Sequence, residues 1–146
     1  MKYYKLNPDA KAPTRNKATD AGLDLYALED TFIPVGETAK IKTGIALYVR
    51  ENHYAKIEDR SSLAAKGLRT GGGVIDHGYN GDVTVVLHNF SNKDNESAIG
   101  LRGYYIKAGD KIAQAVLIPI AIEETKELGV LWNSSRGDGG FGSSGS

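Results

Sequence analysis

Apolar side chains recur at every second position in several short segments of this chain. In residues 39–49, for example, every odd-numbered position except Thr43 is apolar. A period of two predicts β-strands with one buried face. The same reasoning predicts strands at Lys2–Leu6, His53–Glu58, Val83–His88 and Leu101–Ile106. Residues Lys111–Ile122 are nearly all apolar, as expected of a strand that is covered on both faces.

Glycine-rich turns separate the predicted strands. Asn80–Gly81 is a favourable two-residue turn, and it predicts a hairpin between Val74–Ile75 and Val83–Val86. Many short strands with regular turn signals are typical of an all-β barrel or jelly roll.

Only residues 60–67 have helical character. Ser61 or Ser62 can cap the start of this helix, and Gly67 can end it.

The chain has 146 residues, which suits one compact domain. We expect a β-barrel domain over residues 1–132, with an extended loop at about 91–103. Residues 133–146 are rich in glycine and serine, which predicts a flexible C-terminal arm.

Composition excludes several classes of protein. Basic and acidic residues are equal in number, 18 each, so we expect no direct nucleic-acid binding. The chain has no cysteine, which excludes disulfides and thiolate metal sites. We see neither a signal peptide nor an apolar run of the roughly 20 residues that span a bilayer. The expected location is cytoplasmic, or nuclear in a eukaryote or virus, with no membrane contact.

Two polar segments in the first half of the chain are candidates for binding a charged ligand. Asp24 stands between two leucines in a strand-like run, so its carboxylate faces water or a cation. Arg60 offers a guanidinium fork for phosphate oxygens, and Ser61 and Ser62 add hydroxyls and free amides. Taken alone, the acid also fits an edge strand kept soluble, and the second segment fits a capped surface helix.

The segment Gly71–Asp82 combines three glycines with an acid and a tyrosine. Glycines let the backbone close tightly against a ligand. The carboxylate of Asp76 can act as a general base if it reaches a water molecule, and Tyr79 lies at the predicted turn. A tight hairpin with a solvated acid is the simpler interpretation.

Two further segments complete the set. Gln114 is the lone polar side chain within an apolar run, so its amide needs a partner from the protein or from a ligand. Arg136 and Phe141 lie among glycines and serines near the C-terminus, where a plain linker needs neither.

Together, and in this order, these five segments resemble the five motifs of the trimeric dUTPase family. The resemblance runs from about Asp20 to the end of the chain. It implies a jelly-roll homotrimer that hydrolyses dUTP to dUMP and pyrophosphate, which keeps uracil out of DNA and supplies dUMP for thymidylate synthesis. It also implies that three subunits form each site: one supplies the first, second and fourth motifs, a second the hairpin, and a third the arm.

The resemblance also assigns roles to matching residues. Asp76 would activate the water that attacks the α-phosphorus, and Tyr79 would stack on the deoxyribose. Asp24 would hold Mg²⁺ through water. The remaining substrate-binding positions fall into a phosphate group, a base group and an arm group: Arg60, Ser61, Ser62 and Gln114; Thr70, Gly73, Val74 and Ile75; and Arg136, Phe141 and Gly142.

The sequence departs from the family pattern at four places, of which Asp82, in place of a commoner glutamate or asparagine, is expected to be harmless. Asp59 stands where the family usually has proline or glycine, so its charge either weakens phosphate binding or points away. Thr70 replaces a usual asparagine or aspartate. The link from Asn89 to Gly109 is longer than usual, and the loop at 91–103 is a possible protein-partner site.

Two alternatives to dUTP hydrolysis remain open. A dCTP deaminase shares the fold, but it needs a glutamate near the hairpin, and Gly71–Asp82 contains none. A binding module that uses the nucleotide as a switch is the second alternative, and only the long link supports it.

Overall fold

The computed structural model describes residues 1–91, 95–96, 102–135 and 137–138. Within these residues the chain forms twelve β-strands and one short helix. The elements are β1 (Lys2–Lys5), β2 (Gly22–Tyr26), β3 (Thr31–Pro34), β4 (Thr38–Ile41), β5 (Ile45–Tyr48), β6 (His53–Glu58), α1 (Ser61–Ala64), β7 (Leu68–Gly71), β8 (Val74–Asp76), β9 (Val85–Asn89), β10 (Asn95–Glu96), β11 (Arg102–Ile106) and β12 (Lys111–Pro119).

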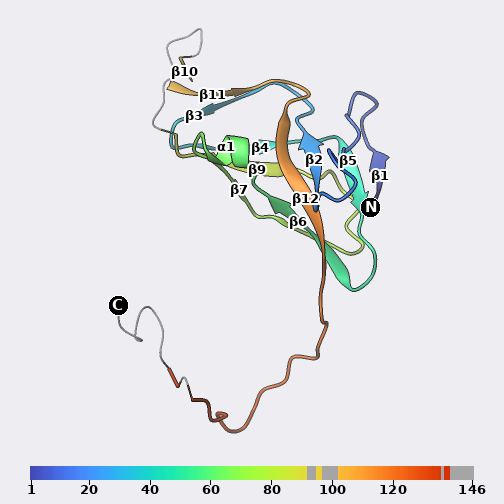
Figure 1. Ribbon diagram of the computed structural model, residues 1–146, viewed down its shortest axis with the longest axis vertical. Helices are drawn as coiled ribbons and strands as arrows, with labels where there is room; N and C mark the ends of the chain where they lie inside the picture. The colour runs from blue at the N-terminus through green and yellow to red at the C-terminus, as the bar shows by residue number, and fades with distance from the viewer. Residues whose placement is uncertain (92–94, 97–101, 136, 139–146) are drawn as a thin grey trace.

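The strands form four antiparallel sheets that enclose one core. The orders are β1-β5, β10-β11-β3, β2-β12-β6-β8 and β4-β9-β7. In Figure 1 the sheet containing β12 and β6 lies in front of the sheet containing β9 and β7. Neighbours in each sheet are mostly distant in sequence, and the fold is an all-β jelly roll.

The core follows directly from the alternation in the sequence. In β6, Ala55 and Ile57 are buried and their neighbours are only partly covered. In β9, Val85 and Leu87 are buried in the same way. Side chains from all four sheets form one continuous apolar cluster, and burial of this cluster is the main source of stability.

Most predicted strands are confirmed to within a residue or two. His53–Glu58 is β6 with the predicted bounds. The apolar run that begins at Lys111 is a strand only as far as Pro119. Its last backbone bond to the barrel is donated by Ile120 to the carbonyl of Asn52, at 2.9 Å. Ile122 is 73% exposed, so the covered strand ends earlier than its apolar pattern predicts.

The predicted hairpin at Asn80–Gly81 is wrong. β8 pairs with β6, whereas β9 pairs with β4 and β7. The chain turns earlier, because Gly78 adopts a φ of 87° directly after β8. Neither Asn80 nor Gly81 has the positive φ that a type I′ hairpin turn requires.

The predicted helix at residues 60–67 is shorter than expected. α1 covers Ser61–Ala64, and Arg60 is its N-cap residue without a side-chain cap. Capping by Ser61 or Ser62 is therefore wrong. Gly67 does end the turn as predicted, with a φ of 86°.

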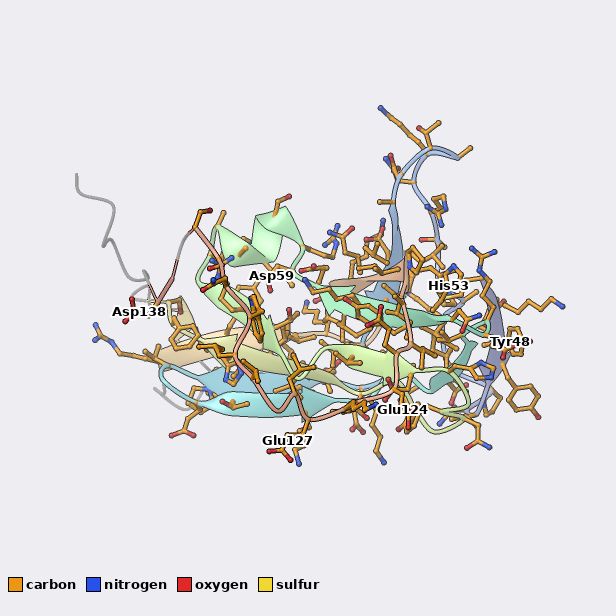
Figure 2. The ribbon with its side chains drawn as sticks, turned by 90° about the horizontal axis from the view of Figure 1, so that it is seen from below. Tyr48, His53, Asp59, Glu124, Glu127 and Asp138 are labelled. Carbon is orange, nitrogen blue, oxygen red and sulfur yellow. The ribbon has the colours of Figure 1, made fainter. Side chains whose placement is uncertain are left out.

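After β12 the chain leaves the barrel as an extended segment (Figures 1 and 2). Leu128, Val130, Leu131 and Trp132 are 63–83% exposed on it. Glu124 and Glu127 also lie on this segment. Among the described residues, no helix has the length and apolar character needed to cross a membrane.

Candidate functional site

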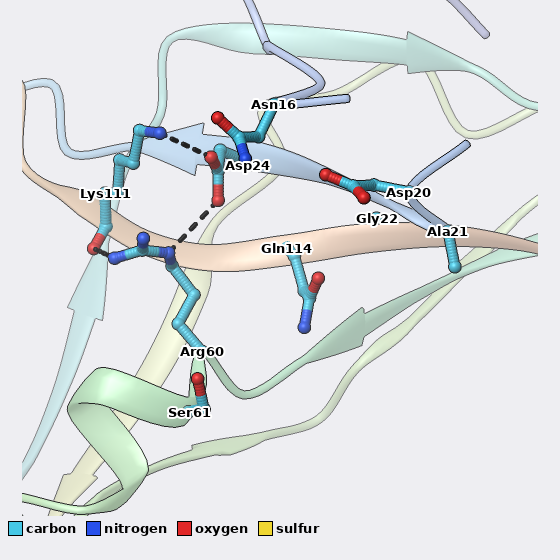
Figure 3. Close-up of a pocket in the computed structure, with 9 residues that line it drawn as sticks. All are labelled: Asn16, Asp20, Ala21, Gly22, Asp24, Arg60, Ser61, Lys111 and Gln114. Atoms are coloured by element: carbon cyan, nitrogen blue, oxygen red, sulfur yellow. Dashed lines mark hydrogen bonds and ion pairs between the residues drawn. The ribbon is translucent and has the colours of Figure 1, made fainter. Parts of the chain in front are cut away.

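A hollow of about 470 Å³ opens beside β2 and β12 (Figure 3). Three segments that are distant in sequence line it, and we call it the Asp24 hollow. The lining residues are Asn16, Asp20, Ala21, Gly22, Asp24, Arg60, Ser61, Lys111 and Gln114.

Strand register places three of these side chains on one face. Asp24 of β2 lies opposite Gln114 of β12, and Tyr26 lies opposite Lys111. The register shifts between Lys111 and Ala113, which marks a β-bulge. Because the bulge adds one residue, Lys111 faces the same side as Gln114 although the two are three positions apart.

One carboxylate joins the two cations of the hollow. Arg60 Nε donates to Asp24 Oδ1 at 3.1 Å, and Lys111 Nζ lies 2.6 Å from Asp24 Oδ2. Arg60 Nη1 also donates to the backbone carbonyl of Lys111 at 3.2 Å. The hydrogen bond to Asp24 raises the pKa of the Lys111 ammonium. Lys111 therefore stays charged near neutral pH, and Asp24 holds both cationic side chains in place by contacts within one chain.

Gln114 is also held in a defined position. Its Nε2 donates to the backbone carbonyl of Asp59 at 2.9 Å. A Cβ added at Gly22 would lie 2.1 Å from Gln114 Oε1, so only glycine leaves room for this side chain. The protein partner expected for a buried amide is thus the Asp59 carbonyl.

Ser61 lines the Asp24 hollow, whereas Ser62 does not. Both serines are exposed in the single turn of α1. Neither hydroxyl is used as a helix cap, so both can meet a ligand on the exposed side of the described structure.

Asp76 and Tyr79, the candidates of the segment Gly71–Asp82, lie away from the Asp24 hollow. Asp76 ends β8, and its exposed carboxylate accepts no hydrogen bond from the part of the chain that the structure describes. Tyr79 donates its hydroxyl to the carbonyl of Asp82 at 3.0 Å and lines a separate groove with Tyr48 and His77. One chain therefore does not bring Asp76 and Tyr79 to the two cations.

A smaller hollow of about 260 Å³ lies between β6 and the glycine-rich segment, and we call it the glycine hollow. Three candidates of the base group line it: Thr70, Gly73 and Val74. The fourth, Ile75, does not line it and is half-buried in β8. The lining residues are Lys56, Ile57, Glu58, Asp59, Thr70, Gly71, Gly72, Gly73 and Val74.

Arg136, Phe141 and Gly142 lie outside the described residues, as do residues 92–94 and 97–101 of the long loop. The proposed roles of the arm and the loop therefore remain predictions.

Lys111 is the main site residue that the sequence analysis missed. It immediately follows Gly109–Asp110, so its place in the fourth segment was a usable signal. Simple alternation puts it on the face opposite Gln114, and only the bulge reverses that placement. Asn16 and Asp20 were missed because they lie in a loop without periodicity.

Within the described residues, no three histidine or acidic side chains are grouped to bind a metal ion. Asp24 and Asp20 supply the carboxylates of the Asp24 hollow. A cation there would thus depend on oxygen ligands from elsewhere.

Comparison with known proteins gives one consistent result. A dUTPase family model matches residues 8–145. The deoxyuridine 5'-triphosphate nucleotidohydrolase of Candida albicans is 43% identical over 99% of this chain and 87% of the relative.

Solved structures agree with this relationship. A dUTPase variant of Staphylococcus bacteriophage 80alpha, solved with dUpNHpp, superposes with a TM-score of 0.88 at 31% identity, covering 99% of this chain and 98% of that one. A dUTPase variant of phage phi11 of S. aureus, described with a structural Mg(II) ion, gives 0.80 at 29% identity, covering 90% and 98%. The match over nearly the whole length shows that this chain belongs to the dUTPase family.

Proposed function

We propose that this chain hydrolyses dUTP to dUMP and pyrophosphate by attack of water on the α-phosphorus. The observation that carries the proposal is the Asp24 hollow, where a dUTPase-family chain holds two cations and an amide side by side. The reaction would keep uracil out of DNA and supply dUMP for thymidylate synthesis.

The phosphate chain of the nucleotide would lie in the Asp24 hollow. Arg60 has a planar fork that suits phosphate oxygens, and its position is fixed by Asp24 and the Lys111 carbonyl. Lys111 adds a second charge, and Ser61, Ser62 and Gln114 add neutral donors. Preorganised donors of this kind stabilise charge that develops in the transition state.

Magnesium fits this hollow as an ion carried by the substrate. Both oxygens of Asp24 are already engaged by cations, at 3.1 and 2.6 Å, which favours contact with the ion through water. Mg²⁺ keeps several water ligands and commonly binds substrate phosphates with few carboxylates. When bound, the ion would neutralise phosphate charge.

The uracil ring would bind against the glycine hollow and the exposed edge of β8. β8 is the last strand of its sheet, so the backbone of Val74 and Ile75 is accessible on one side. Backbone amides and carbonyls there can pair with the polar edge of uracil. Gly73 gives close approach, Thr70 lies at the entrance, and Tyr79 would stack on the deoxyribose.

Asp76 would act as the general base. Its carboxylate is exposed at the end of β8 and carries no side-chain bond within the described part of the chain. A carboxylate within reach of a water molecule can take its proton during the attack.

A homotrimer would bring these parts together. The segment after β12 exposes Leu131 at 83% and Trp132 at 69%, and large apolar side chains at such exposure favour a partner surface. Asp76 of one subunit would then face the Asp24 hollow of a second, and the arm of a third, with Arg136, Phe141 and Gly142, would close over the nucleotide. Closure excludes water and strengthens the charge contacts.

The experiment is an assay of pyrophosphate release from dUTP, dCTP, dTTP and UTP with Mg²⁺ present. The proposal expects dUTP to be preferred by orders of magnitude. Release of ammonia from dCTP would instead identify a deaminase. Tight dUTP binding without turnover would favour the nucleotide-switch alternative.

A further inference from the structure

Asp59 contacts both sides of the candidate site, although its carboxylate points away from the Asp24 hollow. Its Oδ1 accepts from the backbone amide of Thr70 at 2.6 Å and from the Thr70 hydroxyl at 2.8 Å. Its Oδ2 accepts from Arg69 Nη1 at 2.8 Å. Its backbone carbonyl accepts from Gln114. Of the two alternatives considered for this acid, the structure shows that it points away; Figure 2 shows Asp59 close to α1.

The segment Gly71–Gly73, which we call the glycine segment, is fastened to neighbouring parts of the chain at both ends. At one end, the amide of Ile57 donates to the carbonyl of Gly73 at 2.8 Å. A Cβ at Gly73 would lie 2.6 Å from the Ile57 carbonyl oxygen, so the two backbones are in close contact. At the other end, Thr70 and Gly71 lie in β7, which pairs with β9, and Asp59 adds its two bonds to Thr70. Gly72 lies between these two ends.

Glycines without fixed ends have more accessible conformations than any other residue. Gly72 adopts a φ of 61°, which favours glycine, and a glycine has no side chain to restrain its backbone. The shape of the glycine hollow therefore depends on the Ile57 fastening, on the pairing of β7 with β9, and on the Asp59 fastening. The first two are made by backbone groups, whereas the Asp59 fastening depends on one side chain.

The bonds to Thr70 contribute more than the ion pair does. The Arg69 side chain is 58% exposed, and exposed ion pairs contribute little because water screens them. Thr70 is only partly exposed, and its amide and hydroxyl donate to a charged acceptor.

We propose that Asp59 is a positioning residue, whose carboxylate fixes the Thr70 end of the glycine segment and so sets the discrimination between uracil and thymine. The inference rests on the proposed function, because it assumes that the base binds at the glycine hollow. Thymine differs from uracil by one methyl group. A backbone that cannot move away excludes this methyl, whereas a mobile one admits it.

The test compares kcat/KM for dUTP with kcat/KM for dTTP in Asp59→Ala and in the unaltered chain. We expect the ratio to fall by about tenfold in Asp59→Ala, within the range known for one methyl group in a binding pocket. Asp59→Asn should keep most of the ratio, since its amide oxygen still accepts from Thr70. Arg69→Gln is the matched control, and it should leave the ratio unchanged because it removes only the exposed ion pair.

A residue that merely stabilises the fold would lower the melting temperature without moving this ratio. An unchanged ratio in folded Asp59→Ala would overturn the inference, as would an equal loss for both nucleotides. If Asp59→Ala does not fold, Thr70→Val supplies the second test, because it removes the hydroxyl donor and keeps the shape. A partial fall in the ratio is then expected, and no fall would overturn the inference.

The two proposals fail in different ways. If the unaltered chain does not hydrolyse dUTP, or does not prefer it to dTTP, the proposed function fails. If the unaltered chain prefers dUTP and Asp59→Ala keeps that preference, only the role of Asp59 fails.

Discussion

The Asp24 hollow and the β8 segment differ in how far one chain completes them. In the Asp24 hollow, Arg60 and Lys111 are both fixed by the same carboxylate, at 3.1 and 2.6 Å. At the end of β8, Asp76 is exposed, and no described residue donates to its carboxylate. The hollow is organised before any ligand binds, whereas the carboxylate at the end of β8 has no partner among the described residues of its own chain.

This difference separates two roles in the proposed site: binding of the charged phosphates, and action on the nucleotide once it is bound. Groups that bind a highly charged ligand are best fixed in advance, because their reorganisation would cost binding energy. A general base and a stacking ring act on the nucleotide only after it is bound. They can therefore come from a neighbouring subunit, as the exposure of Asp76 and Tyr79 suggests.

Replacement of Asp76 tests the role of the exposed β8 segment and has the largest expected effect. Asp76→Asn should lower kcat for dUTP by about 10²–10⁴-fold, because the amide cannot take a proton from water. Binding of a non-hydrolysable dUTP analogue, measured by calorimetry, should stay close to that of the unaltered chain. Glu51→Gln, at an exposed turn, is the control. Turnover near the original value would remove Asp76 from the role of base.

Removal of the residues after Trp132 tests whether the arm completes the site. The truncated chain should fold and assemble normally, because the described residues of the arm add nothing to the core. Its kcat/KM for dUTP should fall by about 10²-fold, since closure no longer positions the nucleotide. Steady-state kinetics and light scattering check both expectations. Full activity would exclude the arm from catalysis.

Mixing the Asp76→Asn chain with the chain truncated after Trp132 tests whether one subunit supplies both Asp76 and the arm. If Asp76 and the arm come from different subunits, random mixed trimers should restore roughly a quarter of the sites, because each of two positions is filled correctly half the time. Mass spectrometry would confirm mixing, and pyrophosphate release would report the rescue. No rescue in proven mixed trimers would mean that one subunit supplies both parts.

The sequence predicted the jelly roll and most of the strands, because strand alternation is a local property. β6 and β9 bury every second residue as the pattern indicates. It failed at Asn80–Gly81, because strand pairing is decided by the whole barrel. β8 finds its partner in β6, before the favourable turn is reached.

The candidate site shows the same division between local and long-range information. Asp24 and Gln114 stood out as polar residues in apolar strands, and they lie directly opposite each other. Lys111 was missed because a bulge cannot be read from alternation. The orientation of Asp59 was undecided in the sequence, since Thr70 lies eleven residues away and becomes its neighbour only in the fold.

Replacement of Lys111 tests the organised side of the comparison, with a moderate expected effect. Lys111→Met should raise KM for dUTP by about tenfold and change kcat less, because a charged donor to the phosphates is lost while Asp76 is untouched. Steady-state kinetics over a range of salt concentrations gives the measurement. The salt dependence of KM should weaken, because one cation fewer attracts the nucleotide. An unchanged KM would place Lys111 outside the phosphate site.

Acid unfolding tests the Asp59 fastening and has the smallest expected effect. Partial burial raises the pKa of Asp59, but the bonds from Thr70 and the charge of Arg69 outweigh it, so the pKa lies below its usual value. The folded chain therefore binds this proton less readily than the unfolded chain. The contribution of Asp59 to stability is complete above the unfolded pKa of about 3.9, and it is lost as pH falls through the lower folded value.

Asp59→Asn makes this contribution measurable. At pH 7 its Tm should lie about 3 °C below that of the unaltered chain, because the charged acceptor for Thr70 is gone. The gap should shrink as the pH falls below about 4, where the unfolded chain takes up this proton, and it should close below the lower folded pKa, where the native carboxylate is protonated as well. Arg69→Gln is again the control, and its gap should be small at every pH because the ion pair is exposed. A Tm difference for Asp59→Asn that stays constant down to the acid transition would mean that the negative charge of Asp59 does not hold Thr70. The preorganised contacts of the site would then include Gln114 but not Thr70.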